Sequence, residues 1–125
     1  MTRASFMVVH TVVALAFGIA FVVSPASMLA LYGVGTDAAG AFMSRLLGAT
    51  MIQIGLVAWL ARKDTDTAAR RAVQLGYTAG IAVGLIVALL GQLSGLFNAF
   101  GWSTVAIYLL MAAGYGYFHA RPTAA

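Results

Sequence analysis

One dense run of charge, from Arg62 to Arg71, divides this chain into two halves of similar plan. The run holds four of the seven basic residues and two of the three acidic ones, and long apolar segments lie on either side of it. Soluble domains contain about 25% charged residues, whereas this chain contains 8%. Helices with so little charge cannot offer a soluble surface. The sequence therefore predicts an all-α integral membrane protein that forms one domain over residues 1–125.

Four apolar segments are long enough to cross a bilayer, whose hydrocarbon core requires about 17–25 helical residues. Between the first two, Ser24-Pro25 is typical of a helix start and Gly33 of a helix stop. We expect a short helix here, at the membrane interface, with a hydrophobic loop packed on the bundle as the alternative. The predicted fold is a membrane four-helix bundle with an interfacial helix after the first span. The expected ranges are about 6–23, 25–33, 38–61, 68–91 and 103–119.

The first apolar segment also has features of a secretory signal peptide. Arg3 precedes it, and Ser24-Pro25-Ala26 resembles a small-residue cleavage site. Signal peptides contain an apolar region of only about 7–15 residues. Because the segment 6–23 is longer, we expect it to remain as a membrane span.

The distribution of basic residues predicts the orientation. The connector between the second and third spans carries Arg62, Lys63, Arg70 and Arg71, whereas the other two connectors carry no Lys or Arg. With four spans, both termini lie on the same side as this connector. The positive-inside rule places that side in the cytoplasm. The net charge of +4 thus serves orientation, and we expect the lipid bilayer, not nucleic acid, as the partner.

Small residues recur at every fourth position of the segment 68–91, which places them on one helix face. Such a stripe allows a second helix backbone to approach closely in lipid. Packing inside one monomer is the favoured interpretation, and self-association into a homo-oligomer or larger complex is the other. The helix-packing candidates are Ala72, Gly76, Gly80, Gly84 and Ala88.

Arg45 is the most informative polar residue because it lies about two turns inside the outer end of its span, where a charge needs partners or must reach the interface. Tyr32, Asp37 and Tyr108 are expected in the same outer half and are candidates to interact with it. The functional interpretation is contact with an anion or a lipid headgroup. The alternative is that Arg45 ties the short interfacial segment to the spans.

A second group of polar residues is expected in the cytoplasmic half, where it would form a pocket if the side chains face inward. The candidates are His10, Gln53, Tyr77 and His119. Two histidines on different helices could ligate a haem iron, but the two depths differ, since His10 lies more than a turn inside and His119 lies at the boundary. We therefore expect no cofactor and no metal.

Several chemistries are excluded by missing residues. The chain contains no cysteine, which rules out thiol redox pairs and thiolate metal sites. Its acids, Asp37, Asp64 and Asp66, all lie in or beside connectors, so the membrane-embedded carboxylate of a proton-coupled exporter is missing. The sequence contains no nucleophile elbow or phosphate loop, and it favours a non-enzymatic protein.

Several short motifs resemble those of the DoxX-like families and neighbouring four-helix families of small bacterial membrane proteins. The motifs are Ser24-Pro25-Ala26, Tyr32-Gly33, Arg45-Leu46-Leu47-Gly48 and Gly55-Leu56. The resemblance covers mainly residues 20–60. It implies four spanning helices and the bacterial inner membrane. Some DoxX relatives are subunits of quinone-linked oxidoreductases, but the residues of such an activity are not found here.

Two functions follow as hypotheses. The first is an accessory subunit or self-associating bundle, favoured by the glycine stripe and the lack of catalytic groups. The second is a binder or carrier of a small apolar or anionic molecule, such as a quinone or a lipid. Gly76, Gly80 and Gly84 packed against another chain would favour the first function. A lined cavity that reaches Arg45 or His10 would favour the second.

Overall fold

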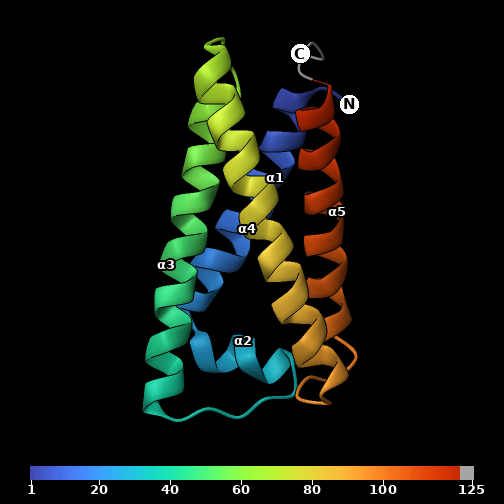
Figure 1. Ribbon diagram of the computed structural model, residues 1–125. Helices are drawn as coiled ribbons and strands as arrows, with labels where there is room; N and C mark the ends of the chain where they lie inside the picture. The colour runs from blue at the N-terminus through green and yellow to red at the C-terminus, as the bar shows by residue number, and fades with distance from the viewer. Residues whose placement is uncertain (122–125) are drawn as a thin grey trace.

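A computed structural model describes residues 1–121 of the chain, and five helices make up most of them (Figure 1). Their bounds are close to the expected ranges: α3 covers the predicted span, while α1, α4 and α5 extend a few residues beyond theirs. The short helix ends slightly earlier than expected. The helices are α1 (Arg3–Val23), α2 (Pro25–Leu31), α3 (Ala38–Ala61), α4 (Thr67–Leu93) and α5 (Gly101–Ala120).

Local sequence accounts for most helix ends. Asp37 accepts a hydrogen bond from the Gly40 amide at 2.8 Å and so caps α3, and Asp66 caps α4 in the same way through the Ala68 amide at 2.8 Å. Pro25 occupies the first turn of α2, where its missing N–H costs nothing. Gly33 has a φ of 75°, the left-handed conformation that ends a helix and favours glycine. These short-range signals are all visible in the sequence.

Three of the helices, α1, α3 and α4, are long and apolar enough to cross a membrane, judged by length and composition. Helix α5 is not among them, although it runs alongside α4 for much of its length (Figure 1). Its three tyrosines, Trp102 and His119 lower its mean hydropathy. Apolar helices of this length are the expected membrane spans of an integral membrane protein.

Helices α1 and α3 form the first pair, and their backbones approach closely at glycines. A Cβ added to Gly48 would lie 2.6 Å from the carbonyl oxygen of Gly18, and one added to Gly18 would lie 2.8 Å from the carbonyl oxygen of Gly48. Further along, the hydroxyl of Thr11 donates to the carbonyl of Gly55 at 3.1 Å. Small residues thus bring this pair together, as expected for helices that pack in lipid.

Helices α4 and α5 form the second pair, which is held by larger side chains. The ring of Tyr108 on α5 covers Gly84 on α4, and Ile81 and Met111 are buried in the same core cluster. Near the loop between these helices, the side-chain amide of Gln92 donates to the Asn98 carbonyl at 3.1 Å.

The two pairs are joined at both ends (Figure 1). At the end with the chain termini, α1 packs against α5 through aromatic contacts of Phe6 with Tyr115 and Phe118. At the opposite end, α2 lies across the bundle, and the amide of Asn98 donates to the Tyr32 carbonyl at 2.9 Å. Between these two junctions, α3 and α4 diverge from their shared loop toward α2 (Figure 1).

Candidate functional site

A large open cavity lies between the two helix pairs, with a volume of about 910 Å³. Residues of all five helices line it, and most of them are aliphatic or aromatic. None of its lining residues within 1–121 is Asp, Glu, Lys or Arg. An apolar cavity with a few hydrogen-bonding groups is the usual form of a site for a small apolar molecule.

One wall of this cavity is the small-residue face of α4. Ala72, Gly76, Gly80, Gly84 and Ala88 all line the cavity. Among the described residues, an added Cβ at Gly76 or Gly80 would have no heavy atom within 4 Å apart from its own helix backbone, whereas one at Gly84 would strike the Tyr108 ring. The expected packing of the stripe against another helix of the monomer is therefore not found at Gly76 and Gly80. The reason is that α3 diverges from α4 here, so the stripe borders open space.

The end of the cavity nearest the chain termini contains a cluster of hydrogen-bonded aromatic residues. His10 Nδ1 and the Tyr115 hydroxyl lie 2.6 Å apart, and the rings of His10 and Tyr77 meet edge to face with centroids 5.0 Å apart. The Tyr77 hydroxyl donates to the Ile54 carbonyl of α3 at 2.6 Å. His10 and Tyr77, both expected in a cytoplasmic-half pocket, are thus brought together from α1 and α4.

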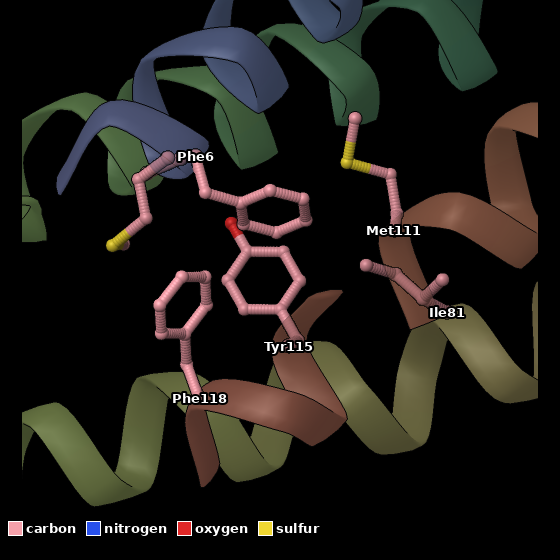
Figure 2. Close-up of a cluster of buried hydrophobic side chains, with 7 residues drawn as sticks. Phe6, Ile81, Met111, Tyr115 and Phe118 are labelled. Atoms are coloured by element: carbon pink, nitrogen blue, oxygen red, sulfur yellow. The ribbon is translucent and has the colours of Figure 1, made fainter. Parts of the chain in front are cut away.

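Tyr115 is the centre of this cluster and is fully buried, with 0% exposure. Figure 2 shows its ring among the side chains of Phe6 and Phe118, with Met111 and Ile81 nearby. These neighbours fix the ring and so fix the position of its hydroxyl beside His10. The spacing of polar residues along α5 does not distinguish Tyr115 from the exposed Tyr117, because only packing decides which tyrosine faces inward.

The opposite end of the cavity is closed by α2 and the loop before α5. Tyr32 is buried there, with its hydroxyl 2.6 Å from Thr104 Oγ1 and its ring edge to face with Phe97 at a centroid distance of 5.6 Å. Tyr108 also lines this part of the cavity. Tyr32 and Tyr108 therefore belong to the same site, although the sequence suggested them as partners of Arg45.

Arg45 and Asp37 lie elsewhere. Arg45 is exposed, and its Nε donates to the carbonyl of Val22 at 3.2 Å, which links α3 to the end of α1. Asp37 is exposed and caps α3. Neither lines the cavity.

The two remaining candidates also lie outside the cavity. Gln53 is exposed on α3. His119 is exposed near the end of α5, where it lines a separate, smaller pocket together with residues of α4. His10 and His119 thus face different spaces.

Two residues that shape the cavity were not identified from the sequence. Thr11 and Gly48 define the α1–α3 crossing and so fix the wall opposite the stripe. Gly48 and Gly55 are seven residues apart, two turns of one helix face, and this spacing could have revealed the crossing.

The cavity combines a long apolar space with hydrogen-bonding groups at both ends. His10 and Tyr77 line one polar end, where the buried Tyr115 hydroxyl lies within hydrogen-bond distance of His10, and Tyr32 with Thr104 forms the other end. Within residues 1–121, no three His, Asp or Glu side chains gather as metal ligands. Comparison with protein-family models, curated proteins and solved structures finds no match, so the resemblance to DoxX-like families stays a prediction.

Proposed function

We propose that this chain is an integral membrane protein that binds an elongated apolar molecule with a hydrogen-bonding head, of the quinone or lipid class, between its two helix pairs. The observation that carries the proposal is the cavity of about 910 Å³ that reaches His10. Ligand pockets for small molecules are commonly about 300–1,000 Å³ and mainly apolar. The volume and lining are therefore suited to one such ligand.

The ends of the cavity supply the recognition. A carbonyl or hydroxyl on the ligand would find imidazole and phenol groups at the His10 end, and its apolar part would lie along the glycine stripe. Gly76 and Gly80 are important because any side chain at these positions would occupy the same space. Since the lining carries no charged residue, a neutral ligand body is favoured.

In this proposal the protein crosses the membrane four times, with both termini and the charged α3–α4 loop in the cytoplasm. The three apolar helices and the basic loop support it. Helix α5 would be the fourth span, because it extends, like α1, from the end with the chain termini to the end where α2 lies (Figure 1). Helix α2 would lie at the outer interface.

A second candidate function is favoured by one specific observation, the open face at Gly76 and Gly80. A helix of another protein, or of a second copy, could occupy that face, which would make the chain an accessory subunit or a self-associating bundle. Both functions use the same space, so a bound helix and a bound ligand would exclude each other.

The test is to fill the cavity without disturbing the helix contacts. Gly80→Leu adds a side chain inside the cavity, and Gly116→Leu is the matched control, because Gly116 lies outside the cavity and also has open space around it. Native mass spectrometry of the gently extracted protein would report bound lipid or quinone and the number of copies.

We expect the wild-type chain and Gly116→Leu to retain one ligand, and Gly80→Leu to lose it with an unchanged thermal melt. Loss of a dimer in Gly80→Leu, with no ligand in any sample, would support self-association instead. Equal ligand retention in all three proteins would contradict the proposed site.

A further inference from the structure

A second pocket lies beside the start of α4, at the end of the molecule that carries the charged loop. Its volume is about 260 Å³ and its lining residues are Thr67, Arg70, Arg71, Gln74 and His119. The four α4 residues follow the spacing i, i+3, i+4 and i+7, which places them on one helix face. None of the five lines the large cavity, so the two sites can be tested separately.

The pocket is strongly basic. Two guanidinium groups line it, and no carboxylate of residues 1–121 does. The two acids of the adjacent loop are engaged in local capping bonds: Asp66 accepts from the amides of Ala68 and Ala69, and Asp64 accepts from the amide of Asp66 at 2.9 Å. The positive charge of Arg70 and Arg71 therefore faces a space that lacks an anion from the lining residues.

Gln74 provides an independent indication of a ligand. Its side chain is only 5% exposed, and its Nε2 is buried without a hydrogen-bond partner among the described residues. A buried amide donor without an acceptor costs free energy. Because Gln74 lines the basic pocket, an anionic oxygen bound there could supply the missing acceptor.

We infer that this pocket binds a phosphate group. Arg70 and Arg71 supply two planar guanidinium donors, which match phosphate oxygens in geometry and charge. Gln74 contributes an amide donor and Thr67 a hydroxyl donor on the same helix face. The phosphate can belong to a phospholipid headgroup or to a soluble phosphate compound. The lipid source rests on the proposed orientation, in which this end of α4 meets the headgroups.

The experiment measures binding of three probes to the full chain in detergent: phosphatidylglycerol, phosphatidylcholine and inorganic phosphate. Native mass spectrometry gives lipid affinities, and calorimetry gives that of inorganic phosphate. The variants are Arg71→Gln, which removes an exposed charge, and Gln74→Leu, which removes the amide at similar volume. Lys63→Gln is the control, because it removes one positive charge from the neighbouring α3–α4 loop, outside the pocket.

Loss of one charged or buried donor should weaken binding about tenfold. We expect Arg71→Gln and Gln74→Leu to show this loss and Lys63→Gln to keep wild-type affinity. If phosphatidylglycerol binds more tightly than phosphatidylcholine, and the three variants have these effects on its affinity, the result supports a lipid headgroup. If the variants have these effects on the affinity for inorganic phosphate, and phosphatidylglycerol is not preferred over phosphatidylcholine, the result supports a soluble phosphate compound.

An equal loss in Lys63→Gln and Arg71→Gln would mean a diffuse basic surface and would overturn the inference, as would unchanged affinity in both pocket variants. Ligand retention in the large cavity is an independent measurement, because the residues changed here do not line it. Failure of the phosphate site is therefore distinguishable from failure of the proposed function.

Discussion

At the scale of single residues, the same amino acid has opposite roles in the two helix pairs. Gly48 is needed because the backbone of α1 passes within contact distance, whereas Gly80 leaves space that none of residues 1–121 fills. Both occur in apolar helices with other small residues on the same face. The sequence can therefore locate such a face, but it cannot tell whether a helix or a cavity lies opposite.

The first prediction concerns Gly48. In Gly48→Ala the new Cβ would lie 2.6 Å from the Gly18 carbonyl oxygen and 2.9 Å from Phe21 Cβ. Overpacking typically costs about 1–3 kcal/mol, more than the about 0.5–1 kcal/mol that alanine gains over glycine in a helix. We expect a net loss of roughly 1–2 kcal/mol, measured by unfolding in detergent.

Gly116→Ala is the control for this measurement, because no described residue approaches within 4 Å of an added Cβ there. It should leave the stability unchanged or slightly increased. If Gly48→Ala proved as stable as Gly116→Ala, the close crossing of α1 and α3 would be wrong.

At the scale of elements, local signals explain why the helices were predictable. The apolar lengths and the Asp37 and Asp66 caps lie within short windows of sequence, and the helices begin and end close to the expected positions. The pairing of helices depends on contacts between distant residues, such as Thr11 with Gly55. His10 and Tyr77 were recognisable as polar residues in apolar helices, but their meeting with Tyr115 required the fold.

Arg3 connects the start of α1 to the α3–α4 loop. Arg3, which the sequence showed only as a basic residue before the first apolar segment, is 3% exposed and donates to the loop carbonyls of Arg62 at 3.1 Å and Asp64 at 3.3 Å. The start of α1 thus restrains the α3–α4 loop, which also precedes the basic pocket.

We expect Arg3→Leu to loosen this loop. Lost hydrogen bonds from a charged donor are worth about 1.5–3 kcal/mol, so local opening should become about tenfold or more frequent. Limited trypsin digestion, followed by mass spectrometry of cleavage after Arg62 and Lys63, measures the effect. Arg121→Leu removes another terminal arginine, which stacks on Tyr117, and should not change cleavage of this loop. Equal cleavage in both variants would show that Arg3 does not restrain it.

At the scale of the whole molecule, the arrangement of contacts explains the cavity. The helix pairs meet at the aromatic junction of Phe6 with Tyr115 and at the junction of Tyr32 with Thr104 and Asn98, while the section between them is open. The contacts at the two ends of the molecule hold the two helix pairs apart in the section between them. An unfilled apolar space of this size costs packing energy in a folded chain, which is offset when a ligand, a lipid tail or another helix occupies it.

The last prediction concerns the path of α5, because three helices qualify as spans by composition and α5 does not. Its C-terminal part packs against the start of α1 through Phe118 and Phe6, and its N-terminal part reaches Tyr32 through Thr104. Helix α5 therefore extends from the end with the chain termini to the end where α2 lies, as α1 does (Figure 1), and it should cross the bilayer if α1 does. Reporter fusions after residues 66 and 125 should both report the cytoplasm, and a fusion near residue 98 should report the outside. A cytoplasmic signal near residue 98 would contradict four crossings, and an outside signal after residue 125 would show that α5 does not cross, leaving α1, α3 and α4 as the spans.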